Sequence, residues 1–262
     1  MTKQERPIDD IRAASERFAQ TLIYEDNHLL VCNKPADLAT MGDADSLTLH
    51  RLATAYLKIR YNKPAGVYVG IVSRLDRMTT GAIVLARTSK AASRLSAQFA
   101  SRSEKPEKIY LAVVEGDLPG TKASLSDWIF KDEAAHRMRC MGDQASLYSD
   151  VKTQRAELCY EVLARLKGQT VVAVRLMTGR KHQIRVQFAD RGFPVVGDRK
   201  YGADTRWPLG IALHSRQLRV IHPTLRQPMT FTAPLPNGWP VAVRATIEGL
   251  QSICPSPARK DN

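Results

Sequence analysis

Cysteine is scarce in this 262-residue chain. The four cysteines, Cys32, Cys140, Cys159 and Cys254, form no Cys-x-x-Cys pair, and no histidine stands at a spacing typical of zinc ligands. The sequence therefore predicts no metal site. We expect reduced thiols, mostly in or near strands, where cysteine acts as a small apolar side chain.

Long hydrophobic runs are absent as well. No segment approaches the roughly 18 apolar residues of a membrane helix, and the first six residues, MTKQER, contain nothing that resembles a signal peptide. A hydrophobic content of 44% and a charged content of 25% are ordinary for a folded soluble protein. We expect a cytoplasmic protein without membrane contact, with a core of one large domain or two small ones.

A glycine-rich phosphate loop is also missing after the first expected strand, which disfavours nucleotide-dependent enzymes and a nucleotide cofactor. Acidic residues are few: 39 Lys and Arg face 26 Asp and Glu, for a net charge of +13. Residues 165–226 hold most of this excess. Such a field suits a polyanion, because neutralising phosphates releases counterions; a solvated basic face that only maintains solubility is the alternative.

Strands outnumber helices in the apolar pattern. One helix is predicted to begin at Ser89, which would cap it. A second is predicted over Lys181–Arg191 and would end at Gly192, and a third would run from Trp239-Pro240 to Leu250. Short connections favour an antiparallel-rich α+β fold over a doubly wound one. Strands are expected at 22–24, 29–32, 67–72, 82–86, 109–115, 157–163, 171–177, 211–214, 218–221 and 229–232.

The expected organisation is one main domain with two short flanks. Residues 1–20 would be a leader or short outer helix, 21–250 the folded domain, and 251–262 a disordered tail. Residues 117–155 are polar and poorly periodic, which predicts a long loop or a hairpin insertion.

The strongest candidate site is Ser73-Arg74-Leu75-Asp76-Arg77-Met78-Thr79-Thr80-Gly81, directly after an apolar run. Asp76 lies between two arginines. Fixed positive charges keep a carboxylate ionised and oriented, as a nucleophile or a base requires. Asp76 is therefore the leading catalytic candidate.

A second candidate site is Thr178-Gly179-Arg180-Lys181-His182-Gln183-Ile184-Arg185. If a helix begins near Lys181, its free amides together with Arg180 and Lys181 form an anion site, with Arg185 one turn further along. An ordinary helix start with exposed basic residues is the alternative. A third candidate is Tyr110, in the expected strand 109–115, although a tyrosine in a sheet is usually only a packing residue.

These segments resemble the motifs of the RluA-type RNA pseudouridine synthases, which carry His-Arg-Leu-Asp before Thr-Ser-Gly, Lys-x-Tyr-x-Ala, and Gly-Arg-Thr-His-Gln-Ile-Arg. The similarity runs from about Leu22 to Trp239, and includes Gly197-Asp198 with Tyr201-Gly202. Departures are Ser73 for histidine, Thr80 for serine, Lys181 for threonine and, at Asp37, aspartate for the usual glycine; aspartate tolerates a positive φ better than most residues.

The resemblance implies the pseudouridine synthase fold, a largely antiparallel mixed sheet flanked by helices and loops around a central RNA-binding cleft. It also implies isomerisation of uridine in ribosomal or transfer RNA, with a flipped base, by a monomer without cofactor or metal and without the N-terminal S4 RNA-binding domain of larger relatives. Catalytic residues would be Asp76, Tyr110, which stacks on the uracil, and Arg185, which pairs with Asp76. RNA-binding residues would be Arg74, Arg77, Thr79, Arg180, Lys181, His182 and Leu213.

Two alternatives remain at this point. A catalytically silent RNA-binding or ribosome-assembly factor would keep the scaffold without a product, and intact Asp76, Tyr110 and Arg185 disfavour it. A hydrolase that uses an Asp-Arg pair on a small acidic substrate would not need the large basic excess.

Overall fold

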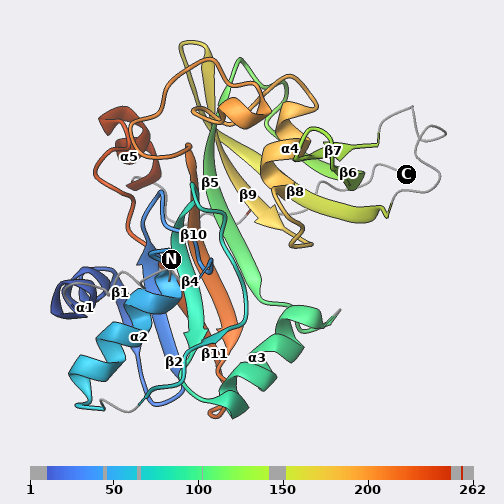
Figure 1. Cartoon of the computed structure of the whole chain (residues 1–262). Coiled ribbons are helices and arrows are strands. Elements are labelled where there is room, and N and C mark those ends of the chain that lie inside the picture. The colour runs from blue at the N-terminus through green and yellow to red at the C-terminus, as the bar shows by residue number, and fades with distance from the viewer. Residues whose placement is uncertain are drawn as a thin grey trace. The chain divides into compact units, whose positions relative to one another are not determined.

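The computed structural model describes residues 11–43, 46–63, 66–101, 103–141, 152–248 and 255. The chain divides into two compact units, which are described separately. Unit 1 comprises residues up to Pro106 together with Ser215–Pro234, and unit 2 comprises Glu107–His214 and the chain from Leu235. Figure 1 shows the elements of each unit along the chain.

Unit 1 contains strands in the order β1 (Leu22–Glu25), β2 (Leu29–Lys34), β4 (Thr80–Ala86) and β10 (Leu213–Ile221, in this unit from Ser215), with β1–β2 and β2–β4 paired antiparallel. The short strand β3 (Gly70–Ile71) pairs with β4, and β11 (Pro228–Thr232) pairs with β10. The strands β2 and β4 alternate their side chains between two cores, as the period of a strand requires. Helices α1 (Ile11–Ala19) and α2 (Leu49–Arg60) contribute to one core, and α3 (Ser89–Ala100) contributes to the other.

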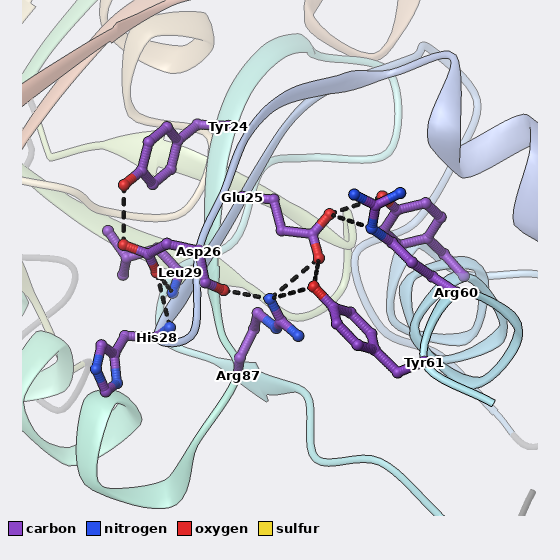
Figure 2. A network of polar contacts seen from close by, with 9 residues as sticks. Tyr24, Glu25, Asp26, His28, Leu29, Arg60, Tyr61 and Arg87 are labelled. Atoms are coloured by element: carbon purple, nitrogen blue, oxygen red, sulfur yellow. Dashed lines mark hydrogen bonds and ion pairs between the residues drawn. The ribbon is translucent and has the colours of Figure 1, made fainter. Parts of the chain in front are cut away.

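A polar network ties the end of β1 to α2 and β4 (Figure 2). The buried Glu25 carboxylate accepts hydrogen bonds from the Tyr61 hydroxyl at 2.6 Å and from Arg87 Nη1 at 3.0 Å. Asp26 Oδ1 accepts the backbone N–H groups of His28 and Leu29, both at 2.7 Å, which closes the turn between β1 and β2. Charged groups therefore fix the connection between the two strands that the sequence predicted at 22–24 and 29–32.

Unit 2 is an antiparallel sheet in the order β5 (Glu107–Glu115), β9 (Gln169–Leu176), β8 (Gln154–Leu166), β6 (Lys122–Asp132) and β7 (Arg137–Cys140). Helix α4 (Gln183–Ala189) packs against it, with Phe188 5.3 Å from the Tyr160 ring. A 3-10 turn (Arg199–Tyr201) follows, and helix α5 (Val241–Glu248) contacts β8. The expected antiparallel-rich α+β class is confirmed.

Several expected boundaries were wrong. Of the strand expected over 67–72 only Gly70–Ile71 forms, and it pairs with Ala86 and Leu85 at the end of β4. The two strands expected at 211–214 and 218–221 are one, β10, since its polar middle is satisfied: Ser215 Oγ donates to Ala82 O at 3.0 Å. Thr88 rather than Ser89 caps α3.

Of the other expectations, some were confirmed, one helix was missed, and some concern residues outside the description. The polar stretch 117–155 contains the hairpin β6–β7, and residues 142–151 within it lie outside the described residues. Helix α2 was missed, although Thr48 caps it and Leu49, Leu52 and Tyr56 are buried at helical spacing. Cys32, Cys140 and Cys159 are free thiols in strands as expected. The expectations for residues 1–10, for most of the tail 251–262 and for Cys254 concern residues outside the description.

None of the described helices is both long and apolar enough to pass through a lipid bilayer.

Gly81, the last residue of the Asp76 motif, has the strictest backbone requirement in unit 1. Its φ is +115°, and a Cβ atom there would lie 2.3 Å from Ser215 O and 2.5 Å from Ser215 N in the neighbouring strand. Only glycine tolerates both the positive φ and the close approach of another backbone.

We expect Gly81→Ala to lower the free energy of unfolding by about 3–5 kcal/mol, because the backbone of β10 would have to move. The matched control is Gly168→Ala, at φ +70° with nothing within 4 Å, which carries only the conformational cost of about 1 kcal/mol. Urea unfolding of both variants measures the difference. Equal losses would show that contact with Ser215 is unimportant.

Candidate functional site

The Asp76 motif is a loop between β3 and β4 in unit 1. Arg74 and Arg77 are exposed, Asp76 is half-buried, and Thr79 is buried, with a side chain only 2% exposed. The Thr79 N–H donates to Asp76 O at 3.1 Å and closes a turn, while the Thr79 hydroxyl is buried without a hydrogen-bond partner. The loop thus presents its two arginines to solvent and encloses Thr79.

The segment that follows β2 forms hydrogen bonds with this loop. The Thr40 hydroxyl donates to Leu75 O at 3.0 Å and accepts the Leu75 N–H at 3.3 Å. Asp37 Oδ1 accepts a hydrogen bond from Arg77 Nε at 2.8 Å, although both side chains are about two-thirds exposed, at 68% and 65%. Asp37 has a φ of +56°, so the positive φ considered for this position is confirmed.

Lys34, the last residue of β2, provides the central contact of this arrangement. It is fully buried, and its Nζ donates to Pro35 O and Leu38 O, both at 2.8 Å, and to Arg77 O at 3.1 Å. Three carbonyl acceptors match the three hydrogens of an ammonium group. A buried cation with all three donors used therefore fixes the loop beside Asp76.

Burial lowers the pKa of Lys34 from 10.5 to about 8, because water no longer stabilises the charge. The Asp76 carboxylate acts in the opposite direction and favours the charged ammonium, as do Cys32 and Asp37. At neutral pH Lys34 is mostly charged, so Asp76 faces a buried positive charge. Burial also raises the pKa of the Cys32 thiol to about 12, which makes it unreactive.

In unit 2 the second candidate segment forms a turn and the start of α4. The helix begins only at Gln183, because His182 has a φ of +53° and cannot continue it backwards. The Arg180 N–H donates to Gln183 Oε1 at 3.0 Å, and the Thr178 hydroxyl donates to the same oxygen at 2.7 Å. The expected helix over 181–191 was therefore too long, and the amide of Arg180 is not available to an anion.

The side chains of this segment separate by exposure. Arg180 and Lys181 are exposed, His182 is half-buried, and Arg185 is buried in α4. Tyr110, 8% exposed, lies on β5 opposite Val174, and Leu213, 3% exposed, begins β10. Among the described residues of the whole chain, no three of His, Cys, Asp and Glu gather as metal ligands would.

Two residues were missed as functional candidates, although the sequence motifs contained both. Asp198 forms a buried ion pair with Arg185, with Oδ2 2.6 Å from Nε and Oδ1 2.9 Å from Nη2. Tyr201 places its ring 5.0 Å from the Arg185 guanidinium carbon. The signal was their position in Gly197-Asp198 and Tyr201-Gly202, to which no role was given.

We expect the free energy of unfolding to depend on pH through the titration of Lys34. Because the folded pKa is about 8 and the unfolded pKa about 10.5, the unfolded chain binds more protons between these values. The free energy of unfolding should therefore rise with pH across this window, by up to about 3 kcal/mol relative to Lys34→Met, which cannot titrate. Urea unfolding at pH 7, 8.5 and 10 measures it. A difference between the two proteins that is independent of pH would contradict this assignment.

Known proteins share both sequence and fold with this chain. The family model for RNA pseudouridylate synthase matches residues 28–190. Ribosomal large subunit pseudouridine synthase D of Xanthomonas campestris pv. campestris is 33% identical over 244 residues, covering 86% of this chain and 69% of that protein. An uncharacterized RNA pseudouridine synthase of Bacillus subtilis is 32% identical over 220 residues, covering 82% and 68%.

Solved structures agree with this result. Human RNA Pseudouridylate Synthase Domain Containing 4 has a TM-score of 0.72 at 21% identity, covering 91% of this chain and 97% of that one, and shows the fold. Human RNA Pseudouridylate Synthase Domain Containing 1 has a TM-score of 0.66 at 26% identity, covering 86% of each chain. The chain therefore belongs to the RluA-type family of RNA pseudouridine synthases, which are isomerases that act on RNA.

Proposed function

We propose that this chain converts specific uridines in ribosomal or transfer RNA to pseudouridine, with Asp76 as the essential carboxylate. The reaction breaks the N1–C1′ bond of the uridine, rotates the base and joins C5 to C1′. The proton on C5 is lost and N1 gains one, so the product is an isomer of the substrate. Relatives named as ribosomal large subunit pseudouridine synthases support ribosomal RNA as one target class.

The observation that supports Asp76 best is how its loop is fixed. Lys34 binds Arg77 O from within the core, and Thr40 holds both backbone groups of Leu75. A carboxylate on a loop fixed on both sides reacts without first losing conformational freedom. The carboxylate is the form that attacks or accepts a proton, and the buried ammonium of Lys34 is the charged group that it attracts.

The other site residues have assigned roles in this proposal. Tyr110 stacks on the extruded uracil and assists proton removal at C5, Arg185 pairs with the Asp76 carboxylate, and Leu213 lines the pocket. A uridine is extruded most easily from a single-stranded loop, where little stacking is lost. The aromatic ring of Tyr110 replaces part of that stacking.

The exposed arginines and lysines bind the RNA backbone in this proposal. Arg74 and Arg77 lie on the surface of the motif loop, and Arg180 and Lys181 lie on the turn before α4. Asp37 already pairs with Arg77, so an RNA phosphate at Arg77 competes with that carboxylate. His182, whose Nδ1 lies 2.8 Å from the Tyr201 hydroxyl, and Thr79 complete the set of RNA-binding residues in this proposal.

We expect Asp76→Asn to abolish pseudouridine formation, by on the order of 10³-fold or more, because the amide can neither attack nor accept a proton. RNA affinity should change little. The measurement is release of tritium from 5-tritiated uridine in total ribosomal and transfer RNA, followed by chemical mapping of the modified position. Asp43→Asn, at an exposed carboxylate of the same unit, is the matched control and should keep full activity.

The same experiment separates the alternatives. No product from the intact protein, together with retained RNA affinity, would favour the silent RNA-binding factor. Salt-insensitive function without RNA affinity would favour a hydrolase acting on a small acidic substrate. Full activity of Asp76→Asn would remove the carboxylate from the mechanism.

We expect Lys181→Ala to weaken binding of RNA of any sequence, because an exposed lysine contacts phosphates and not bases. The slope of log affinity against log salt should become less steep by about 0.7–0.9, the equivalent of one released counterion. Titration at several salt concentrations measures this. An unchanged slope would place Lys181 outside the RNA interface.

A further inference from the structure

The guanidinium of Arg185 is among the most constrained polar groups of unit 2. Asp198 binds it with both carboxylate oxygens, at 2.6 Å to Nε and 2.9 Å to Nη2. The two side chains are 6% and 2% exposed. A bidentate pair of this kind fixes the plane of the guanidinium as well as its position.

Tyr201 limits the same guanidinium from a second direction. Its ring centroid lies 5.0 Å from the Arg185 Cζ atom, within the range of a cation–π contact. The Tyr201 hydroxyl accepts the Met138 N–H at 3.1 Å and lies 2.8 Å from His182 Nδ1. The ring is therefore held at its far end, and cannot turn away from Arg185 without breaking these bonds.

The backbone around Asp198 suits this arrangement. Gly197 has a φ of +85°, and a Cβ atom there would lie 2.6 Å from Trp207 Cβ. Immediately afterwards the chain enters the 3-10 turn Arg199–Tyr201, so one short segment carries both Asp198 and Tyr201. This segment supplies the carboxylate and the aromatic ring that hold Arg185.

Stability alone is a poor reason for this buried pair. Removing two charges from water costs several kcal/mol, and well-packed apolar side chains of similar volume often serve the folded state as well or better. A bidentate ion pair does provide a single orientation of the guanidinium. Such preorganisation matters when another group has to meet that cation in one geometry.

We propose that Asp198 is a positioning residue for catalysis: it fixes the Arg185 guanidinium in the orientation that pairs with the Asp76 carboxylate in the reaction. This inference rests on the proposed function, in which Arg185 pairs with Asp76. Asp198 acts through Arg185 and does not touch the RNA. Tyr201 supports the same orientation through its ring.

The test is a double-mutant cycle of single-turnover rates at saturating enzyme. Asp198→Asn keeps the shape but removes the charge, and should slow pseudouridine formation about 10- to 100-fold, with the RNA dissociation constant within about twofold. Combined with Arg185→Lys, it should add almost no further loss, because the guanidinium it orients is already gone. Independent effects that multiply would overturn the inference.

The control is Asp204→Asn, an exposed carboxylate six residues further on, which should retain the intact rate. Absence of product from the intact protein would refute the proposed function itself, whereas normal rates for Asp198→Asn alongside an active intact protein would refute only the positioning role. A reduced RNA affinity that accounts for the whole loss of Asp198→Asn would also overturn it.

A second measurement does not depend on whether Asp198→Asn folds. In the intact protein, the Nε–H proton of Arg185 should give a downfield, slowly exchanging NMR signal, and rotation of its guanidinium should be restricted. Loss of that signal in Arg185→Lys assigns it. A freely rotating guanidinium would contradict the positioning role even if Asp198→Asn does not fold.

Discussion

A buried positive charge determines how unit 1 presents its candidate catalytic loop. Lys34 is fully buried and binds the carbonyl oxygens of Pro35, Leu38 and Arg77. An ammonium group without these acceptors would be costly to bury. The end of β2, the segment after it and the Asp76 loop therefore have to keep their relative positions for the charge to be satisfied. The same charge interacts electrostatically with the Asp76 carboxylate, so one buried ammonium both fixes the loop and attracts its aspartate.

Unit 2 also contains a buried cation, which is held by a carboxylate and an aromatic ring where Lys34 is held by backbone carbonyls. Its buried cation, Arg185, is satisfied by a carboxylate and by an aromatic ring from one short segment, Asp198–Tyr201. In both units a cation is placed inside the protein and held by partners with little freedom. In the proposed function this rigidity matters because groups that are oriented before the RNA binds do not have to be ordered during the reaction. Exposed basic residues, such as Lys181 and Arg74, remain at the surface, where they meet the RNA backbone in the proposed function.

The apolar pattern predicted a strand well where the buried residues and the residue that ends the strand are close together in the sequence. The strands β2 and β5 appear close to where the pattern predicted them, and Pro35 ends β2 one residue after Lys34. The strand expected over 67–72 was mostly wrong, because apolar side chains can pack on a core without their backbone joining the sheet. The helix expected over 181–191 was too long, since the αL conformation of His182 and the Gln183 side chain close a turn that periodicity does not reveal.

By itself the sequence determined the fold class, the family and the types of side chain at the candidate site, because motifs and hydrophobic periodicity depend on neighbours along the chain. The positive φ of Asp37 was also anticipated, from the glycine that is usual at this position in the resembling family and from the tolerance of aspartate for that conformation. Only the tertiary structure decided which groups satisfy the buried charges. Lys34 meets the carbonyl of Arg77, 43 residues away, and Arg185 meets Asp198, 13 residues away. Such partners are selected by their distance in the folded chain and by the cost of an unsatisfied buried charge. The spacing of residues along the sequence predicts neither this distance nor this cost.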